Sequence, residues 1–301
     1  MFKLLSKESN IFSIPVYIVF LLFVIIAFNI FDFSTLGAII TTITFLGVAL
    51  AYFCFNSIAL NYQTHLPLLL YTVFIFGLYP GHLDLGVAVA LLTNSFLLLL
   101  LTSTNEDLRK KSYVLVGAIT SLNFIFLPTT WPMAVFVVIH VFATSERVGI
   151  NIFRFLLGVV LIAFNYFSIA YFFNMREWDA VYFPFGKMWP LEDYRSLLPL
   201  TPIALMLIYA VYDHFKYYNQ KSPISRYKYT FLLVFSLAQL VTIILYMNKN
   251  YEYLMLLAFP VTIILSRMLR FLPKYWMKEV SLWLIIINLV SYRVLLEVNL
   301  I

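Results

Sequence analysis

Three side chains that could do acid–base chemistry stand in short turns that follow apolar runs. Asp32 occurs in the sequence NIFDFS, and His82 and Asp84 occur in YPGHLD. Carboxylates and imidazoles in such places could act as a general base or as metal ligands. A lone acid in a short turn is more often the N-terminal cap of the following helix. Both interpretations of these three residues stay open from the sequence.

A second group of reactive side chains lies in the segment 174–196, which holds Arg176, Glu177, Asp179 and Arg195. The segment contains four acids, three bases and six aromatic residues in 23 positions. An arginine there could pair with a phosphate while a carboxylate acts as base. The alternative is a connector that lies along the membrane interface with its aromatic rings in the headgroups.

Familiar catalytic motifs are missing from the chain. The sequence has no phosphate-binding glycine loop, no HExxH, no paired-cysteine metal motif and no GxSxG. Cys54 is the only cysteine, so no disulfide can form within the chain. No cofactor and no metal are therefore implied, and the sequence does not decide whether the protein is an enzyme.

The elements that must position these residues follow from composition. Of 301 residues, 63% are hydrophobic and 11% are charged, whereas soluble domains carry about 25% charged residues. In lipid every backbone polar group must be satisfied within its own segment, so each long apolar run predicts a helix. The runs span residues 12–31, 35–59, 66–80, 85–102, 113–127, 131–144, 150–173, 197–213, 229–247, 251–267 and 279–297.

These runs predict an all-α, polytopic transmembrane bundle of about eleven spans that forms one domain over residues 1–301. The runs at 113–127 and 131–144 are short for complete spans, so a re-entrant pair is an alternative that would leave nine. Richness in Phe, Ile, Asn, Tyr and Lys is typical of an AT-rich bacterial genome. We therefore expect a multi-pass protein of a bacterial inner membrane.

The charge distribution predicts the orientation of the bundle. With the N-terminus in the cytoplasm, 15 of the 20 Lys and Arg residues fall in inner segments, as the positive-inside rule requires. The C-terminus is then outside, and segment 174–196 faces outward. Because the net charge of +6 lies in these short loops, we expect membrane lipids and membrane or periplasmic proteins as partners, and no nucleic acid.

The polar residues within the runs are amides and hydroxyls, among them Asn94, Asn123 and Gln239, and no charge falls in mid-span. Such residues usually join neighbouring helices. If they lined a cavity at membrane depth, they would instead favour a transporter or flippase.

The order of features from about 66 to 267 resembles the membrane core of the polyprenyl-phosphate-dependent glycosyltransferases of the C superfamily. The features that carry the resemblance are a short span ending at Pro80, the loop Glu106–Lys111, a span with Gly117 that ends at Pro128, the pair Glu146-Arg147, and the stretch from Tyr251 through Pro260 to Arg267. That family places an acidic motif on a long loop between its first two spans. Here the loop has about four residues, and Asp32 is its only acid.

The whole chain also resembles an uncharacterised integral-membrane family of Bacteroidota, a domain of unknown function. Missing motifs and short loops favour a non-catalytic subunit or scaffold of a cell-envelope assembly. The glycosyltransferase resemblance implies instead a lipid-linked glycan or lipid-handling enzyme. Its candidate catalytic residues are Asp32, His82, Asp84, Arg176, Glu177, Asp179 and Arg195.

Overall fold

The structure is a computed structural model that describes residues 1–7, 13–29, 34–58, 64–81, 83–103, 106–173, 188, 190 and 194–298. Within these ranges the chain is all-α, with twelve α-helices and no strand. The first is a single turn, α1 (Phe2–Leu5). The eleven others are α2 (Ser13–Asn29), α3 (Thr35–Ile58), α4 (His65–Leu78), α5 (Leu85–Leu101), α6 (Glu106–Phe126), α7 (Trp131–Thr144), α8 (Val148–Phe172), α9 (Thr201–Lys216), α10 (Pro223–Tyr246), α11 (Met255–Phe271) and α12 (Tyr275–Glu297).

These eleven helices fall on the eleven predicted runs, and several begin at a different residue. Helix α6 begins at Glu106, seven residues before its apolar run, because the charged stretch 106–111 is also helical. Helix α10 begins at Pro223, where the Ser222 hydroxyl accepts a hydrogen bond from the Ser225 amide (3.4 Å). Before α9 the chain forms the 3-10 helix η4 (Tyr194–Leu200), which contains Pro199. Apolar runs thus located the helices and missed their polar ends.

Six helical segments of the described chain are long and apolar enough to cross a membrane. They comprise α3, α8, α9 with η4, α10, α12, and α11 with the preceding 3-10 helix η6 (Tyr251–Leu254). The apolar parts of α2, α4, α5, α6 and α7 are shorter. The multi-pass class is therefore supported, while the count of eleven spans stays a prediction.

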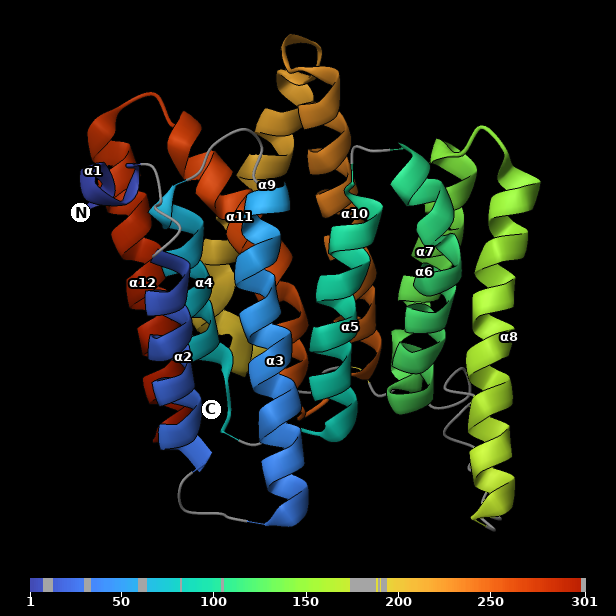
Figure 1. The fold of residues 1–301 in the computed structure, drawn as a ribbon. Helices are drawn as coiled ribbons and strands as arrows, with labels where there is room; N and C mark the ends of the chain where they lie inside the picture. The colour runs from blue at the N-terminus through green and yellow to red at the C-terminus, as the bar shows by residue number, and fades with distance from the viewer. Residues whose placement is uncertain are drawn as a thin grey trace.

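The two short runs form an antiparallel pair of helices, α6 and α7. Helix α6 has 21 residues, which corresponds to a length of about 31 Å. Figure 1 shows the pair passing through nearly the same height of the bundle as α5. The apolar parts of α6 and α7 are shorter than those of the six long segments, so the choice between two full spans and a re-entrant pair stays a prediction.

Helices α2 to α12 alternate in direction, so the loops gather at two opposite ends of the bundle (Figure 1). We call the upper end in Figure 1 the basic end; it carries Arg147, Lys216, Lys221, Arg270 and Lys274. This end contains the loops that the charge pattern predicts to be cytoplasmic. The described chain starts at the basic end, where the Met1 amino group lies 2.9 Å from the Glu279 carboxylate of α12, and α12 runs to the opposite end.

The core of the bundle is centred on α11, which is the most buried of the six long apolar segments. An aromatic cluster joins it to α3 and α4: the Phe55 ring lies 5.3 Å from Tyr71 and 5.0 Å from Phe259. The Phe55–Tyr71 pair is edge-to-face, a geometry that adds to the energy of burial. This cluster fixes α11 against the first half of the chain.

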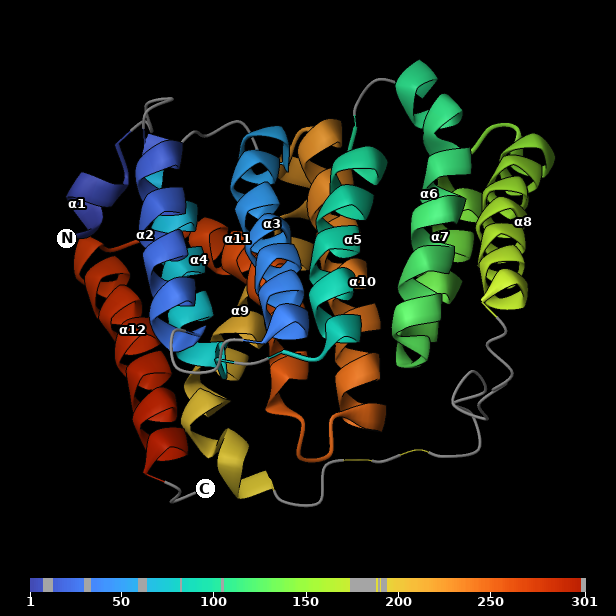
Figure 2. The ribbon, with the colours of Figure 1, turned by 60° about the horizontal axis from the view of Figure 1, so that its bottom comes forward.

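Helices α6, α7 and α8 form a group at one side of the bundle (Figure 2). The α6–α8 contact depends on two glycines. A Cβ on Gly117 would collide with the Phe155 carbonyl, and one on Gly158 would collide with the Val114 carbonyl. Small residues let transmembrane helices approach closely, so these positions set the distance between the two backbones.

One charge lies deeper than the sequence indicated. Arg293, in the predicted run 279–297, is a buried residue near the end of α12. Its guanidinium donates to the Tyr79 carbonyl at the end of α4 and contacts the Glu297 carboxylate at 2.5 Å. The last carbonyls of a helix lack intrahelical donors, so the arginine supplies a donor at the end of α4.

Candidate functional site

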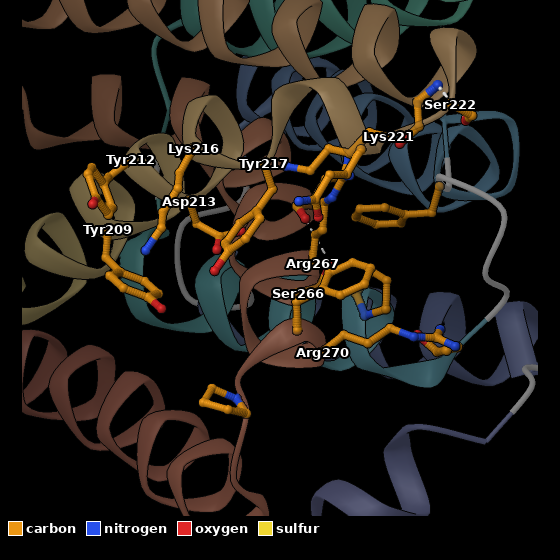
Figure 3. A pocket seen from close by; sticks show the side chains of 18 residues that line it. Tyr209, Tyr212, Asp213, Lys216, Tyr217, Lys221, Ser222, Ser266, Arg267 and Arg270 are labelled. Atoms are coloured by element: carbon orange, nitrogen blue, oxygen red, sulfur yellow. Dashed lines mark hydrogen bonds between the residues drawn. The ribbon is translucent and has the colours of Figure 1, made fainter.

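A cavity of about 610 Å³ opens at the basic end of the bundle. Its walls come from the ends of α9 and α11, the starts of α4 and α10, and the turn between α9 and α10. In Figure 3, Tyr209, Tyr212 and Lys216 gather on one side of the cavity, with Lys221 and Arg267 on the other. Phe55 and Ile263 add apolar surface to the lining. The cavity thus combines a polar mouth with contact to the hydrophobic core.

The cavity is strongly cationic. Lys216, Lys221, Arg267 and Arg270 line it, and Asp213 is the only carboxylate among the lining residues that the structure describes. Lys216 and Arg270 belong to the last turns of α9 and α11. Cations are favoured there because the helix C-terminus carries a partial negative charge. The excess of positive charge suits an anionic ligand.

Arg267 and Lys221 approach the same aromatic ring. The Arg267 guanidinium lies 4.4 Å from the centroid of Tyr229, and the Lys221 ammonium lies 5.8 Å from it. Tyr229 belongs to α10 and is buried. The π-face attracts both cations, so one ring of α10 holds a cation of α11 and a cation of the loop before α10 on the same wall.

Lys221 also contacts His214, a buried residue of α9. Its ammonium lies 3.3 Å from the His214 carbonyl and 3.3 Å from His214 Nδ1. The other ring nitrogen, Nε2, lies 3.1 Å from the Thr230 hydroxyl. If Nδ1 accepts from the ammonium, the imidazole is neutral and its Nε2 donates to Thr230. Burial, with Arg267 nearby, lowers the pKa of Lys221 below its ordinary value of 10.5.

Tyrosines flank the mouth of the cavity. The Lys216 ammonium lies 5.7 Å from the ring of Tyr212 and 5.4 Å from that of Tyr217. Tyr209 lies one turn before Tyr212 on α9 and also lines the cavity. Tyrosine is enriched where a protein meets lipid headgroups because its ring is apolar and its hydroxyl is polar. The mouth therefore has the side chains of a membrane interface.

Two of the predicted catalytic residues lie in the described chain, and neither lines the cavity. Asp84 is the N-cap of α5: its carboxylate accepts a hydrogen bond from the Gly86 amide (3.0 Å), and its own amide donates to the Glu252 carboxylate (2.7 Å). Arg195 lies in η4. Both are near the end of the bundle opposite the basic end. The capping interpretation thus describes the observed contact of Asp84.

Asp32, His82, Arg176, Glu177 and Asp179 lie outside the described residues, as does most of segment 174–196. Their catalytic assignment stays a prediction. Among the residues that the structure does describe, no three His, Cys, Asp or Glu side chains cluster as metal ligands do.

The amides proposed to line a transport path are enclosed by protein. Asn94, Asn123 and Gln239 are buried, and within the described chain their amide atoms have no hydrogen-bond partner. Their burial argues against an open path along them. Ser95 does join helices as expected, because its hydroxyl contacts the Gly47 carbonyl of α3 at 3.3 Å.

The sequence did not predict the cavity. In the sequence its four cations are ordinary flanking charges of two short loops, with Lys216 and Lys221 beside one and Arg267 and Arg270 beside the other. The available signal was the spacing of Arg267 and Arg270, which stand three residues apart and so share a helix face. Their convergence with Lys216 and Lys221 depends on the packing of α9 against α11, which a linear sequence does not display.

Comparison with known proteins assigns the chain to one protein family. Residues 1–300 match the model of a family of unknown function (DUF6427). No curated protein and no solved structure matches the chain.

Proposed function

Because the chain belongs to this family of unknown function, its role has to be inferred from its own residues, and we propose that it is a multi-pass membrane protein that binds a phosphate-bearing anion in the cavity at its basic end. The proposal rests on one observation. Among the described residues that line the cavity of about 610 Å³, four are cationic and one is a carboxylate. This observation supports the lipid-handling alternative for the protein's role.

Phosphate fits the chemistry of the cavity better than other common anions. Arginine binds phosphate through two parallel N–H donors, and lysine binds it as a point charge. Basic pockets between transmembrane helices on the cytoplasmic side hold the headgroups of anionic lipids. The basic end is the side that the charge pattern predicts to be cytoplasmic. The proposed site is thus on the other side of the membrane from the one expected for the glycosyltransferase-like enzyme.

The proposal is tested by calorimetric titration of the purified protein in detergent with dihexanoyl phosphatidic acid. Replacing one charged partner of the phosphate removes a charge-assisted hydrogen bond that is worth about 1.5–3 kcal/mol. We therefore expect the Kd of Lys216→Gln and of Arg270→Gln to rise about tenfold or more.

Lys274→Gln is the matched control, because Lys274 lies at the same end and does not line the cavity. Its Kd should equal that of the unmodified protein. Equal affinity in all four proteins, or no binding to any of them, would refute the proposed function. Circular dichroism spectra confirm that each variant is folded.

A second candidate role is a subunit of a cell-envelope assembly, and one observation on α8 favours it. This helix is the least buried of the six long apolar segments, and it exposes Asn165, whose amide donates to the Leu161 carbonyl of its own helix (2.7 Å). An exposed amide in lipid is stabilised by a polar group of another helix. Stoichiometric membrane or periplasmic proteins that copurify in mild detergent would support this role.

A further inference from the structure

The apolar surface beside the cavity identifies the kind of phosphate compound that enters it. We propose that the ligand is a membrane phospholipid of the leaflet at the basic end, with its phosphate in the cavity and an acyl chain along α9. The inference rests on the proposed function and specifies its ligand.

A continuous stripe of α9 leads from the cavity into the bundle's apolar surface. We call Leu205, Tyr209, Tyr212 and Lys216 the α9 stripe; their spacing of four, three and four places them on one helix face. Leu205 is 63% exposed, Tyr209 45% and Tyr212 61%. The last three members also line the cavity. One helix face therefore connects the cationic site with an open apolar surface.

The exposure of this stripe follows from how little of α9 is packed. Within α9 only Ile203, Ala210 and His214 are buried. These three lie on the face turned to the core, where His214 contacts Lys221 and Thr230. The stripe lies on another face, so an acyl chain can lie along it without displacing protein.

The length of the stripe fits one leaflet. From Lys216 to Leu205 is eleven residues, which corresponds to about 16 Å of helix. Half of the hydrocarbon core of a bilayer is about 15 Å thick. With the phosphate at Lys216, an acyl chain of ordinary length therefore reaches the level of Leu205.

The order of groups along the stripe also matches a phospholipid. The cations stand at the end of the helix, the two tyrosines follow, and the leucine lies deepest. Tyrosine hydroxyls suit the glycerol and ester region, whereas leucine suits the hydrocarbon. A free phosphate or sugar phosphate has no part that would contact Leu205. The order of cations, tyrosines and leucine along the α9 stripe matches the phosphate, glycerol ester and acyl chain of a lipid. For this reason we infer a lipid and not a soluble phosphate ester.

The test measures how much dioleoyl phosphatidic acid stays with the protein. Protein in detergent micelles that contain this lipid is passed over a gel-filtration column equilibrated in lipid-free detergent, and bound lipid per protein is quantified by mass spectrometry. The variants are Lys216→Gln for the cations and the double variant Leu205→Ala/Tyr209→Ala for the stripe. Phe164→Ala on α8 is the control, since Phe164 is exposed and belongs to another helix.

We expect the unmodified protein and Phe164→Ala to retain the lipid, and both the cation and the stripe variants to lose at least half of it. If the stripe variant retains as much as the unmodified protein while Lys216→Gln loses it, the anion site stands and the lipid inference is overturned. If no variant changes retention, the inference fails together with the proposed function. Dioleoyl phosphatidylcholine, which carries no net charge, should be retained less than phosphatidic acid by the unmodified protein.

Discussion

At the scale of single residues, Lys221 is the cation of the cavity whose charge depends most on its surroundings. Its ammonium is close to His214 and Asp213 of α9, to Arg267 of α11 and to the Tyr229 ring of α10. Burial and the positive charge of Arg267 lower its pKa, and Asp213 opposes this shift. Lys221 therefore loses its proton at a lower pH than an ordinary lysine does.

This shift predicts that anion binding weakens in moderately alkaline solution. As the pH rises through the lowered pKa of Lys221, the ammonium becomes a neutral amine and its attraction for phosphate is lost. We expect the affinity of the unmodified protein for dihexanoyl phosphatidic acid to fall at a pH below the ordinary lysine value of 10.5. In Lys221→Arg the fall should be smaller, since a guanidinium keeps its proton in this range. Titrations at several pH values measure this, and parallel curves for both proteins would contradict it.

The sequence shows each cation of the cavity, but it does not show that these cations lie together. Lys216, Lys221, Arg267 and Arg270 each satisfied the positive-inside rule, so no charge was left over to indicate a site. Asp84 drew attention as an isolated acid, and the structure shows it in a capping contact. In this chain, the cations that line the cavity and the cations that merely flank a helix are the same residue types at the ends of helices, so only the spatial convergence of the first group separates the two.

At the scale of elements, the contact between α6 and α8 predicts a large effect from a small substitution. In Gly158→Ala the new methyl group would collide with the Val114 carbonyl and the Ala118 amide of α6. Overpacking of this kind costs about 1–3 kcal/mol, so the midpoint of thermal unfolding should fall by several degrees.

Gly149→Ala is a matched control on the same helix, because a Cβ there meets no heavy atom within 4 Å. Alanine is favoured over glycine in a helix by about 0.5–1 kcal/mol. The melting midpoint of this variant should stay the same or rise. Thermal unfolding in detergent, followed by tryptophan fluorescence, compares the two variants. A stable Gly158→Ala would mean that α8 does not pack as closely as described.

The sequence predicted the helices better than the places where they end. Apolar runs are long in lipid, so α3, α5 and α7 were located almost to the residue. Helices α6 and α10 begin before their apolar runs because a helix can continue into water. Hydrophobicity does not predict the helical residues there. The 3-10 turn before α9 contains Pro199, whose missing amide hydrogen prevents a regular α-helical hydrogen bond there.

At the scale of the whole molecule, the alternation of eleven helices predicts which loops face the cytoplasm. In a Cys54→Ala background, a cysteine at Lys274 should react with a membrane-impermeant maleimide only from the cytoplasmic side. One at Lys249 should react only from outside. Both positions are exposed and lie on opposite ends of α11. Labelling of intact cells and of inverted vesicles measures this, and reaction of both from one side would refute the predicted topology.

The pairing of helices has a consequence for the order in which the protein is made. Helices α6, α7 and α8 are consecutive and contact one another, so this group can assemble as soon as it leaves the ribosome. Helix α4 packs mainly on α11 and α12, and α1 also reaches α12. The chain grows from its N-terminus, so α4 stays in the membrane without its main neighbours until the last two helices are inserted. The cationic cavity is therefore completed only at the end of synthesis, when α11 joins α9.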